Sequence, residues 1–447
     1  MTITEKISLH FNKCQKNGSL IPGDKLPTYA ELCNMFNASY VSVQRAFKSL
    51  EQSGQIKIVH GIGSFLCGQE KLNVELYLPQ STFDFCELKT IIDDIVSEKK
   101  LYLDITLKDS INEGRGIQNL NENRKVVIAE VNSWLKISGA QLDYSAFADY
   151  EKVKQQFKTY NHSANNLEIP FYTFTSQGAI NPKILKQIGF ENKIDSLNNF
   201  SWWDEYIEKC SIAKLVPAAK KWEFHALWHF KEALTFGIPL LMNERGTSKD
   251  IVSLPFFNTA SGRKILQIFR DHASDMSDRC AFMDGKTGIR LDVGSWISVQ
   301  YEKKFGMGKN DFRIIPYTFK NQNVCSFWTH HLQTFVHSSI NQDEKRRIWE
   351  LIKNLVSKKI QRRITALSGS VSVRKDMKIE DHSWADREDY RAFFPQKNDI
   401  LISLKIFPIE VISALSAIYE QYEFFNASEN NILKCMDYKI KSILNPT

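Results

Sequence analysis

The sequence predicts a multi-domain protein, with a small α+β domain at the N-terminus and a large α/β body after it. Three observations support this prediction. A chain of 447 residues is too long for one ordinary hydrophobic core. Residues 1–68 carry three helical patterns and then two short strand patterns, whereas the chain after residue 70 alternates strand, helix and strand. With 43% hydrophobic and 24% charged residues, the composition is that of a globular protein.

The first two helices of the N-terminal domain follow from periodicity and capping residues. Apolar residues recur every four positions from Ile3 to Phe11, and Asn17-Gly18 is typical of a helix end. After a turn punctuated by prolines, Thr28 and Glu31 have the spacing of a capping box. We therefore expect a second helix to begin directly after Thr28.

A third helix and a hairpin complete the domain. Ser39 is the expected N-cap of a helix over residues 40–53, whose apolar side chains repeat with helical spacing. Residues 55–60 and 64–66 have strand patterns, and two glycines lie in the tight turn between them. Three helices followed by a hairpin form a winged helix-turn-helix, which we assign to residues 1–68.

The exposed side of the third helix carries groups suited to duplex DNA. Hydroxyl, amide and guanidinium groups bond base edges and phosphates in a major groove. Residues 1–68 contain six lysines and one arginine against one aspartate and three glutamates, a net charge of +3. The alternative that the domain contacts only protein stays open. The expected DNA contacts are Lys25, Thr28, Ser39, Tyr40, Ser42, Gln44, Arg45, Lys48, His60, Gly61 and Gly63.

Three consecutive blocks of the domain resemble the GntR family of bacterial regulators. They are Leu20 to Cys33, Ala38 to Gly54 and Gly61 to Leu66. Together they contain the turn, both helix caps, the apolar core and the hairpin tip. The resemblance implies a domain that binds double-stranded operator DNA, two copies of which would meet a pseudo-palindromic site as a homodimer. Ala30 and Tyr40 stand where the family commonly has arginine.

The body begins with the alternation that predicts a parallel sheet. Residues 73–78 and 101–107 have strand patterns and flank a helical pattern at 88–99. Val126-Val-Ile-Ala is a further buried strand, and residues 341–357 have an amphipathic helical pattern.

Motifs along the body resemble the sugar-binding proteins of ABC transporters. The most specific ones follow each other in the family's order, from Ala281 to Arg290, at Gly294-Ser-Trp296, at Asp311 to Tyr317, and at Ser368 to Arg374. The resemblance implies a two-lobed α/β body of the type II periplasmic-binding-protein fold over residues 70–447, with a ligand cleft between the lobes. We expect one lobe at 70–175 and 320–395, the other at 180–315, and helices at 396–447.

A sugar cleft needs flat aromatic platforms and hydrogen-bonding side chains, because sugars have apolar faces and a rim of hydroxyl groups. Trp296 follows Gly294-Ser295, where the resembling proteins place a stacking aromatic residue. For each candidate the alternative is a purely structural role in the core. The candidate ligand-binding residues are Trp134, Tyr172, Trp228, Trp296 and Trp328.

The sequence lacks the motifs of metal binding, nucleotide binding and nucleophilic catalysis. The eight cysteines include no C-x-x-C pair, and the adjacent pair His330-His331 does not have the spacing of metal ligands. Gly285-Lys286-Thr287 lacks the first glycine of a phosphate-binding loop, because Cys280 stands there. No G-x-S-x-G sequence is present. We therefore expect neither a metal, nor a cofactor, nor an enzyme.

The predicted function is a DNA-binding transcription regulator that responds to a small molecule, expected to be a carbohydrate. No apolar stretch approaches the roughly 18 residues of a membrane span, and no signal sequence begins the chain, so we expect a cytoplasmic protein without membrane contact. The first alternative is a solute-binding receptor for transport. The second is an enzyme acting on a saccharide, which would need two suitably spaced carboxylates in the cleft.

Overall fold

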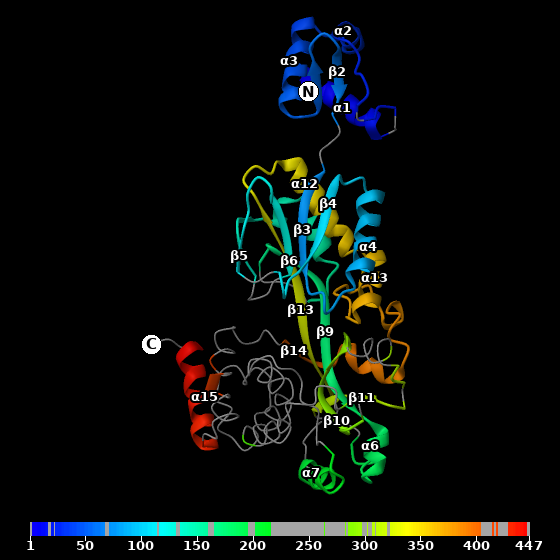
Figure 1. The fold of residues 1–447 in the computed structure, drawn as a ribbon, viewed down its shortest axis with the longest axis vertical. Helices are drawn as coiled ribbons and strands as arrows, with labels where there is room; N and C mark the ends of the chain where they lie inside the picture. The colour runs from blue at the N-terminus through cyan, green and yellow to red at the C-terminus, as the bar shows by residue number, and fades with distance from the viewer. Residues whose placement is uncertain are drawn as a thin grey trace.

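A computed structural model describes residues 2–67, 71–215, 282–319, 322–403 and 428–444, apart from short gaps within these ranges and a few isolated residues outside them. Figure 1 shows a small N-terminal head followed by a larger body. The head holds a two-stranded sheet of its own, and the body holds a large mixed sheet with helices packed against it. The predicted fold class is therefore confirmed.

The head is the predicted winged helix-turn-helix. Its helices are α1 (Ile3–Lys16), α2 (Tyr29–Phe36) and α3 (Tyr40–Gln52), and its hairpin pairs β1 (Ile56–Val59) with β2 (Gly63–Leu66). Burial of one apolar stripe from each helix provides most of the stability of such a small unit. The head core consists of Ile7, Phe11, Leu26, Leu32, Val43, Ala46, Phe47, Leu50, Ile56 and Leu66.

The body begins with three parallel strands. They are β3 (Leu72–Leu78), β4 (Leu103–Asp109) and β6 (Val126–Glu130), with β3 in the middle. Helix α4 (Phe85–Glu98) connects β3 to β4 and buries its apolar side, which is the crossover that a parallel pair requires. Strand β6 is buried along its whole length, in keeping with its run of apolar residues.

Two long antiparallel strands connect the two halves of the body. Strand β9 (Glu168–Ile180) and strand β13 (Gln322–Val336) pair with each other near the middle of the sheet. The end of β13 also pairs with β6, whereas the end of β9 pairs with β10 (Ile289–Gly294). Figure 1 shows both strands running from the half beside the head into the other half. The lobe boundaries expected at 175–180 and 315–320 fall within β9 and shortly before β13.

The remaining elements lie around this sheet or at its edges. Helices α12 and α13 follow β13 and pack with α4, and the short strands extend the sheet or form a separate pair. Their bounds are β5 (Gly116–Asn119), β7 (Leu135–Ser138), β8 (Ala140–Gln141), η1 (Tyr144–Ala146), α5 (Tyr150–Lys154), α6 (Pro182–Gln187), α7 (Trp203–Ile212), β11 (Arg313–Ile315), β12 (Tyr317–Phe319), α12 (Gln342–Leu355), α13 (Lys358–Ser368), η3 (Ile379–Asp381), η4 (Glu388–Phe393), β14 (Ile400–Ser403) and α15 (Glu429–Leu444).

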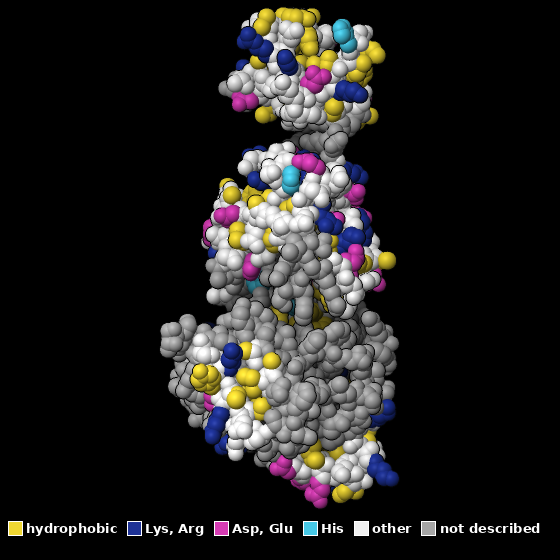
Figure 2. Space-filling model, turned by 60° about the vertical axis from the view of Figure 1, so that its left-hand side comes forward, with side chains coloured by type: hydrophobic (Ala, Val, Ile, Leu, Met, Phe, Trp, Pro, Cys, Tyr) yellow, Lys and Arg dark blue, Asp and Glu magenta, His cyan; other side chains and the backbone are white. Residues whose placement is uncertain are grey.

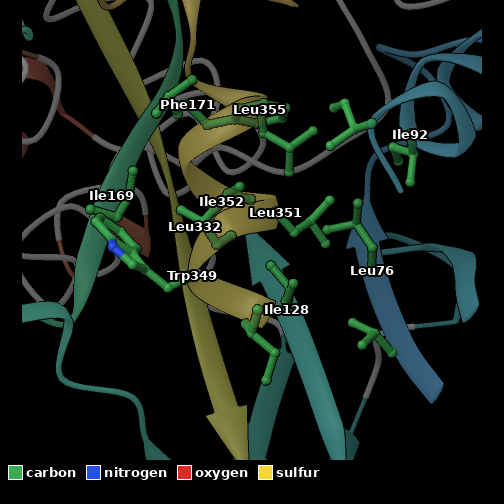
Figure 3. Packing of buried hydrophobic residues seen from close by; sticks show 14 of the residues in the cluster. Leu76, Ile92, Ile128, Ile169, Phe171, Leu332, Trp349, Leu351, Ile352 and Leu355 are labelled. Atoms are coloured by element: carbon green, nitrogen blue, oxygen red, sulfur yellow. The ribbon is translucent and has the colours of Figure 1, made fainter. Parts of the chain in front are cut away.

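The core of the first half packs α12 against the sheet. The predicted apolar stripe of this helix, from Ile348 to Leu355, is buried. Figure 3 shows Leu351 and Ile352 between the strands that carry Leu332 and Leu76. Asn341 caps the helix through a capping box with Glu344.

Two features of the C-terminal third differ from expectation. The helix expected over 341–357 ends at Leu355, because Ser357 is the N-cap of the next helix, α13. The segment expected to be helical from residue 396 contains β14, which pairs in parallel with Val324–Phe327 of β13. Three consecutive apolar residues, Ile400 to Ile402, suit a strand at the edge of a large sheet.

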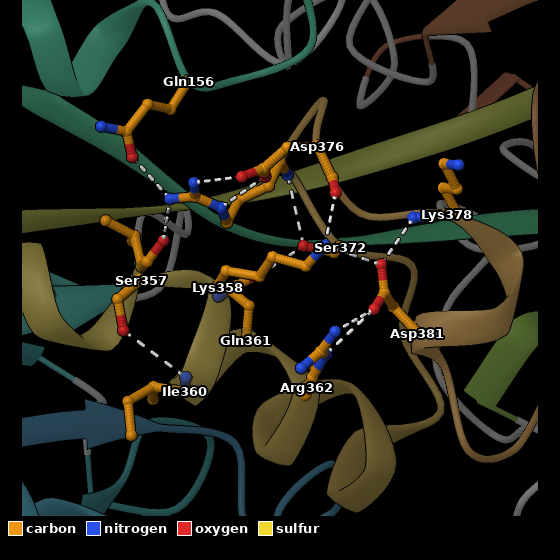
Figure 4. A network of polar contacts seen from close by, with 12 residues as sticks. Gln156, Ser357, Lys358, Ile360, Gln361, Arg362, Ser372, Asp376, Lys378 and Asp381 are labelled. Carbon is orange, nitrogen blue, oxygen red and sulfur yellow. Dashed lines mark hydrogen bonds and ion pairs between the residues drawn. The ribbon is translucent and has the colours of Figure 1, made fainter.

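A polar network fastens the segment after α13 to the body (Figure 4). Arg374 donates to both carboxylate oxygens of Asp376 and to the side-chain oxygen of Gln156. The hydroxyl of Ser372 donates to Gln361 on α13 at 2.8 Å. Because this segment has little regular structure, side chains supply the hydrogen bonds that its buried polar groups need.

Candidate functional site

Helix α3 has one buried side and one exposed side, as a recognition helix requires. Val43, Phe47 and Leu50 are buried in the head core, whereas Arg45 and Lys48 are exposed. Gln44 is also exposed. Figure 2 shows the head with basic side chains spaced over its surface and hydrophobic side chains at the end away from the body.

Several of the expected DNA-contacting hydroxyl groups also have a structural task. The Thr28 hydroxyl donates to Glu31 at 2.9 Å and accepts from the Glu31 amide, which completes the predicted capping box. The backbone amide of Thr28 also donates to the Glu31 carboxylate, and this bond lowers the pKa of Glu31. Ser39 caps α3, and its hydroxyl lies 2.8 Å from that of Ser42. These groups fix where α2 and α3 begin.

The wing has a geometry that only glycine fits at its tip. Gly61 and Gly63 have φ angles of +78° and +136°. At Gly63 an added Cβ would lie 2.6 Å from Cε of Lys25, so the lysine side chain crosses the wing at that point. The backbone amide of Leu26 donates to Ser64 of the wing. Lys25 is thus held at the wing, and its ammonium group is exposed together with His60.

The second candidate site lies where β6, β9 and β13 meet. Trp328 pairs with Phe174, and His330 pairs with Tyr172, across the β9–β13 ladder. The His330 ring stacks on Tyr172 at 4.3 Å and lies between it and Trp328, whose ring centroid is 5.9 Å away. Phe174 meets the edge of His330 at 5.4 Å. A row of aromatic rings therefore lines one face of the two connecting strands.

Glu130, at the end of β6, is the charged group of this row. Its two carboxylate oxygens lie 2.6 Å from the Tyr172 hydroxyl and 2.5 Å from Nδ1 of His330. An ionised carboxylate only accepts, so Tyr172 donates to it and His330 carries its proton on Nδ1. Burial and the charge of Glu130 raise the pKa of Tyr172 well above its ordinary value, which keeps the phenol protonated.

Trp296 extends the aromatic row from the other half of the body. It is half-buried, and its ring meets Phe174 edge-on at 6.4 Å. A Cβ at Gly294 would lie 2.4 Å from Nε1 of Trp296, so only glycine leaves room for the tryptophan in this position. The Gly-Ser-Trp motif thus places one aromatic ring beside the connecting strands.

The structure brings together three of the five expected ligand residues. Trp296 and Trp328 are half-buried at the junction of the two halves, and Tyr172 is completely buried between them and Glu130. In this conformation Tyr172 has no surface to offer a ligand and instead orients Glu130. Trp134 and Trp228 lie outside the described residues. Figure 2 shows hydrophobic side chains recessed at the waist between the halves.

Three members of the row, Phe174, His330 and Glu130, are not among the residues predicted from the sequence. His330 was considered only as a metal ligand, and its neighbour His331 turns away at a bulge in the β9–β13 pairing. The alternation along β13 was the available signal, because Trp328, His330 and Leu332 share one face. The described residues contain no group of three or more His, Cys, Asp or Glu side chains that could hold a metal.

Comparison with solved structures identifies the fold of the body. The chain is similar to the GacH receptor of Streptomyces glaucescens (TM-score 0.59, 13% identity, 85% of this chain and 100% of that one). It is also similar to the maltose-bound MalE3 of T. maritima (0.58, 11%, 83% and 100%) and to the cyclic α-maltosyl-1,6-maltose binding protein of Arthrobacter globiformis (0.56, 12%, 85% and 100%). Fold and sites together define a winged helix-turn-helix protein with a body of the two-lobed solute-binding fold.

Comparison of sequences identifies the head. The profile of the bacterial regulatory proteins of the gntR family matches residues 16–66. The HTH-type transcriptional repressor YtrA of Bacillus subtilis is 32% identical over 92 residues, which make up 21% of this chain and 69% of that protein. The chain belongs to the gntR family of bacterial regulatory proteins. Among the described residues, no helix is both long and apolar enough to span a bilayer.

Proposed function

We propose that this protein is a transcription regulator whose affinity for operator DNA depends on a small molecule bound in the body. The observation that carries the proposal is the combination in one chain of a gntR-family head and a body of the solute-binding fold. The aromatic row at the junction of the two halves favours a carbohydrate, because flat rings pack on the apolar faces of sugars. Its target is chromosomal DNA, which places its work in the cytoplasm.

The proposed mechanism couples lobe closure to the head. A ligand that contacts Trp296 from one half and Trp328 from the other stabilises the closed arrangement of the halves about β9 and β13. In a homodimer this closure changes the spacing of the two heads on a pseudo-palindromic site. A coupling of about 1–3 kcal/mol, typical of allosteric proteins, would change operator affinity roughly 5- to 150-fold.

The proposed DNA contacts divide between the two parts of the head. Arg45, Lys48 and Gln44 on α3 face the major groove, and Lys25 and His60 at the wing meet the backbone. The remaining proposed contacts are Thr28, Ser39, Tyr40, Ser42, Gly61 and Gly63. Their amide and hydroxyl groups lie close to the helix starts and the wing tip, where a phosphate can approach.

The DNA-binding half of the proposal is tested with duplex fragments from upstream of the gene. We expect sequence-selective binding that weakens steeply with salt, because cations on the protein release counterions from DNA. The Arg45→Ala variant should bind more weakly at every salt concentration, and its salt slope should fall by about 1 if Arg45 meets a phosphate. Arg346→Ala, an exposed arginine of the body, is the matched control and should bind normally. An absence of selective binding by the full chain would refute the regulator.

The ligand half is tested by a thermal-shift screen against mono- and oligosaccharides. Binding to the folded state raises the melting temperature. A saccharide that stabilises the protein should also change the affinity of the full chain for DNA. Stabilisation without any effect on DNA binding would favour the transport-receptor alternative, which the solute-binding fold also suits. Turnover of the saccharide during the screen would favour the enzyme.

A further inference from the structure

Val41 is an apolar side chain in the first turn of α3, on the side of the helix that faces away from the head core. It is 53% exposed, and Arg45 and Lys48 follow it four and seven positions later, directly above it on the helix surface. The buried residues Val43 and Phe47 lie on the opposite side. An aliphatic side chain on this outward face does not contribute to the head core. While it faces water, it also gains none of the free energy that burial of its apolar surface would provide.

Tyr40 stands beside Val41 and is held in place by the head. Tyr40 is 57% exposed, and its ring packs edge-on against Tyr29 at 5.5 Å. Tyr29 in turn packs on Phe47 of the core at 4.9 Å. Because Ser39 caps the helix one residue earlier, both side chains project from its first turn. The start of α3 therefore presents a small, ordered apolar surface.

We propose that this surface, formed by Val41 with Tyr40, recognises the C5-methyl group of a thymine at a fixed place in the operator. The proposal rests on the proposed function and assigns base specificity to a residue that charge and hydrogen-bonding arguments overlook. The occupant is duplex DNA, because the exposed cations Arg45 and Lys48 continue the same line of the helix and favour a polyanionic partner.

The chemistry of the major groove permits one apolar target. Thymine alone presents a methyl group there, whereas the other bases present only donors and acceptors. The first turn of a recognition helix contacts base edges. A valine at that place cannot bond a phosphate, so it contributes through burial against the methyl group. Its branched side chain also has a single preferred rotamer in a helix, which loses little entropy on contact.

The test begins with selection of duplexes from a random pool by the full chain at fixed salt. We expect one thymine in each half-site of the selected sequences to depend on Val41. Replacement of that thymine by deoxyuridine removes only the methyl group and should weaken binding about fourfold, the equivalent of about 0.8 kcal/mol for one buried carbon. The Val41→Ala variant should lose thymine enrichment at that position and should bind the uridine and thymine duplexes within about twofold of each other.

The control variant is Leu9→Ala, which removes an equally exposed apolar side chain from α1 of the same head. It should select the same sequences as the unaltered protein. Equal sensitivity to deoxyuridine in the Val41→Ala variant would overturn the inference while leaving the regulator intact. Failure of the unaltered chain to select any sequence would instead refute the proposed function. A change of oligomeric state in the Val41→Ala variant, measured by sedimentation, would identify the surface as a contact between protein copies and overturn the inference.

Discussion

Tyr172 and Tyr144 are both completely buried tyrosines, yet their hydroxyl groups have different partners. Tyr172 donates to the carboxylate of Glu130 at 2.6 Å, whereas the Tyr144 hydroxyl lies 2.8 Å from that of Thr334. Burial raises the pKa of both phenols, so both are protonated at neutral pH. A hydrogen bond to a charged group is worth about twice as much as one between neutral groups.

We therefore expect Tyr172→Phe to destabilise the body more than Tyr144→Phe. The loss in unfolding free energy should be about 2 kcal/mol for Tyr172→Phe and about 1 kcal/mol for Tyr144→Phe. Urea unfolding followed by tryptophan fluorescence measures both, and it reports on the body alone because residues 1–68 contain no tryptophan. Equal losses would mean that the hydrogen bond from Tyr172 to the Glu130 carboxylate stabilises the body no more than the bond between Tyr144 and Thr334 does.

The same comparison bears on the aromatic row. Without the phenol hydroxyl, Glu130 keeps its bond to His330 but loses its second anchor. We therefore expect the Tyr172→Phe variant to have a lower affinity for the ligand than the Tyr144→Phe variant.

Among the elements, the segment that follows α13 depends on one buried histidine, His382. Nε2 of His382 accepts from the backbone amide of Ser372 at 3.0 Å, and its Nδ1 lies 2.8 Å from the carbonyl oxygen of Lys378. The side chain is 3% exposed. Burial, with a smaller contribution from the nearby charge of Lys158, lowers the pKa of His382 to about 4. The folded segment thus requires a neutral imidazole.

This requirement predicts acid sensitivity of the body. An unfolded histidine binds a proton below its ordinary pKa of about 6.5, whereas folded His382 binds one only near pH 4. Its contribution to stability is therefore complete above pH 6.5 and is lost as the pH falls toward 4. Between pH 7.5 and 5.0 we expect about 2 kcal/mol of this loss.

The His382→Gln variant isolates that contribution. Glutamine can accept the Ser372 amide bond but does not titrate. Its unfolding free energy should change by about 2 kcal/mol less than that of the unaltered protein over the same pH interval, measured by urea unfolding at each pH. If the unfolding free energies of the variant and of the unaltered protein change in parallel with pH, groups other than His382 cause the acid sensitivity.

At the scale of the whole molecule, the connection between head and body is short. Strand β2 ends at Leu66 and β3 begins at Leu72. Five extended residues span at most about 18 Å, so movement of the first half of the body changes where a head can reach. Strands β9 and β13 connect this half to the other, and the aromatic row lies on them.

This arrangement predicts reciprocal coupling between ligand and DNA. If a saccharide changes operator affinity by a certain factor, the operator must change saccharide affinity by the same factor. Titration of the full chain with ligand, in the presence and absence of saturating operator duplex, measures that factor. A duplex of scrambled sequence serves as the control. Ligand affinity that is identical with and without the operator would show that the two sites act independently.

Local patterns in the sequence are sufficient to predict the three helices and the hairpin of the head. Caps at Thr28 and Ser39, the apolar stripe of α3 and the wing glycines are local signals, each readable within a few residues. Local patterns also predict strands β3, β4 and β6 and helix α12. The same periodicity places Val41 on the outward side of α3, because a step of 100° per residue separates it from Val43 and Phe47.

The composition of the aromatic row, in contrast, follows from contacts between residues far apart in the sequence. Glu130 and His330 are 200 positions apart, and Tyr172 comes from a third strand. Their meeting depends on the order β9-β13-β6 and on the register of the β9–β13 ladder. A strand slipped by one residue would turn each of these side chains to the opposite face, and no periodicity within a single strand specifies the register of its partner.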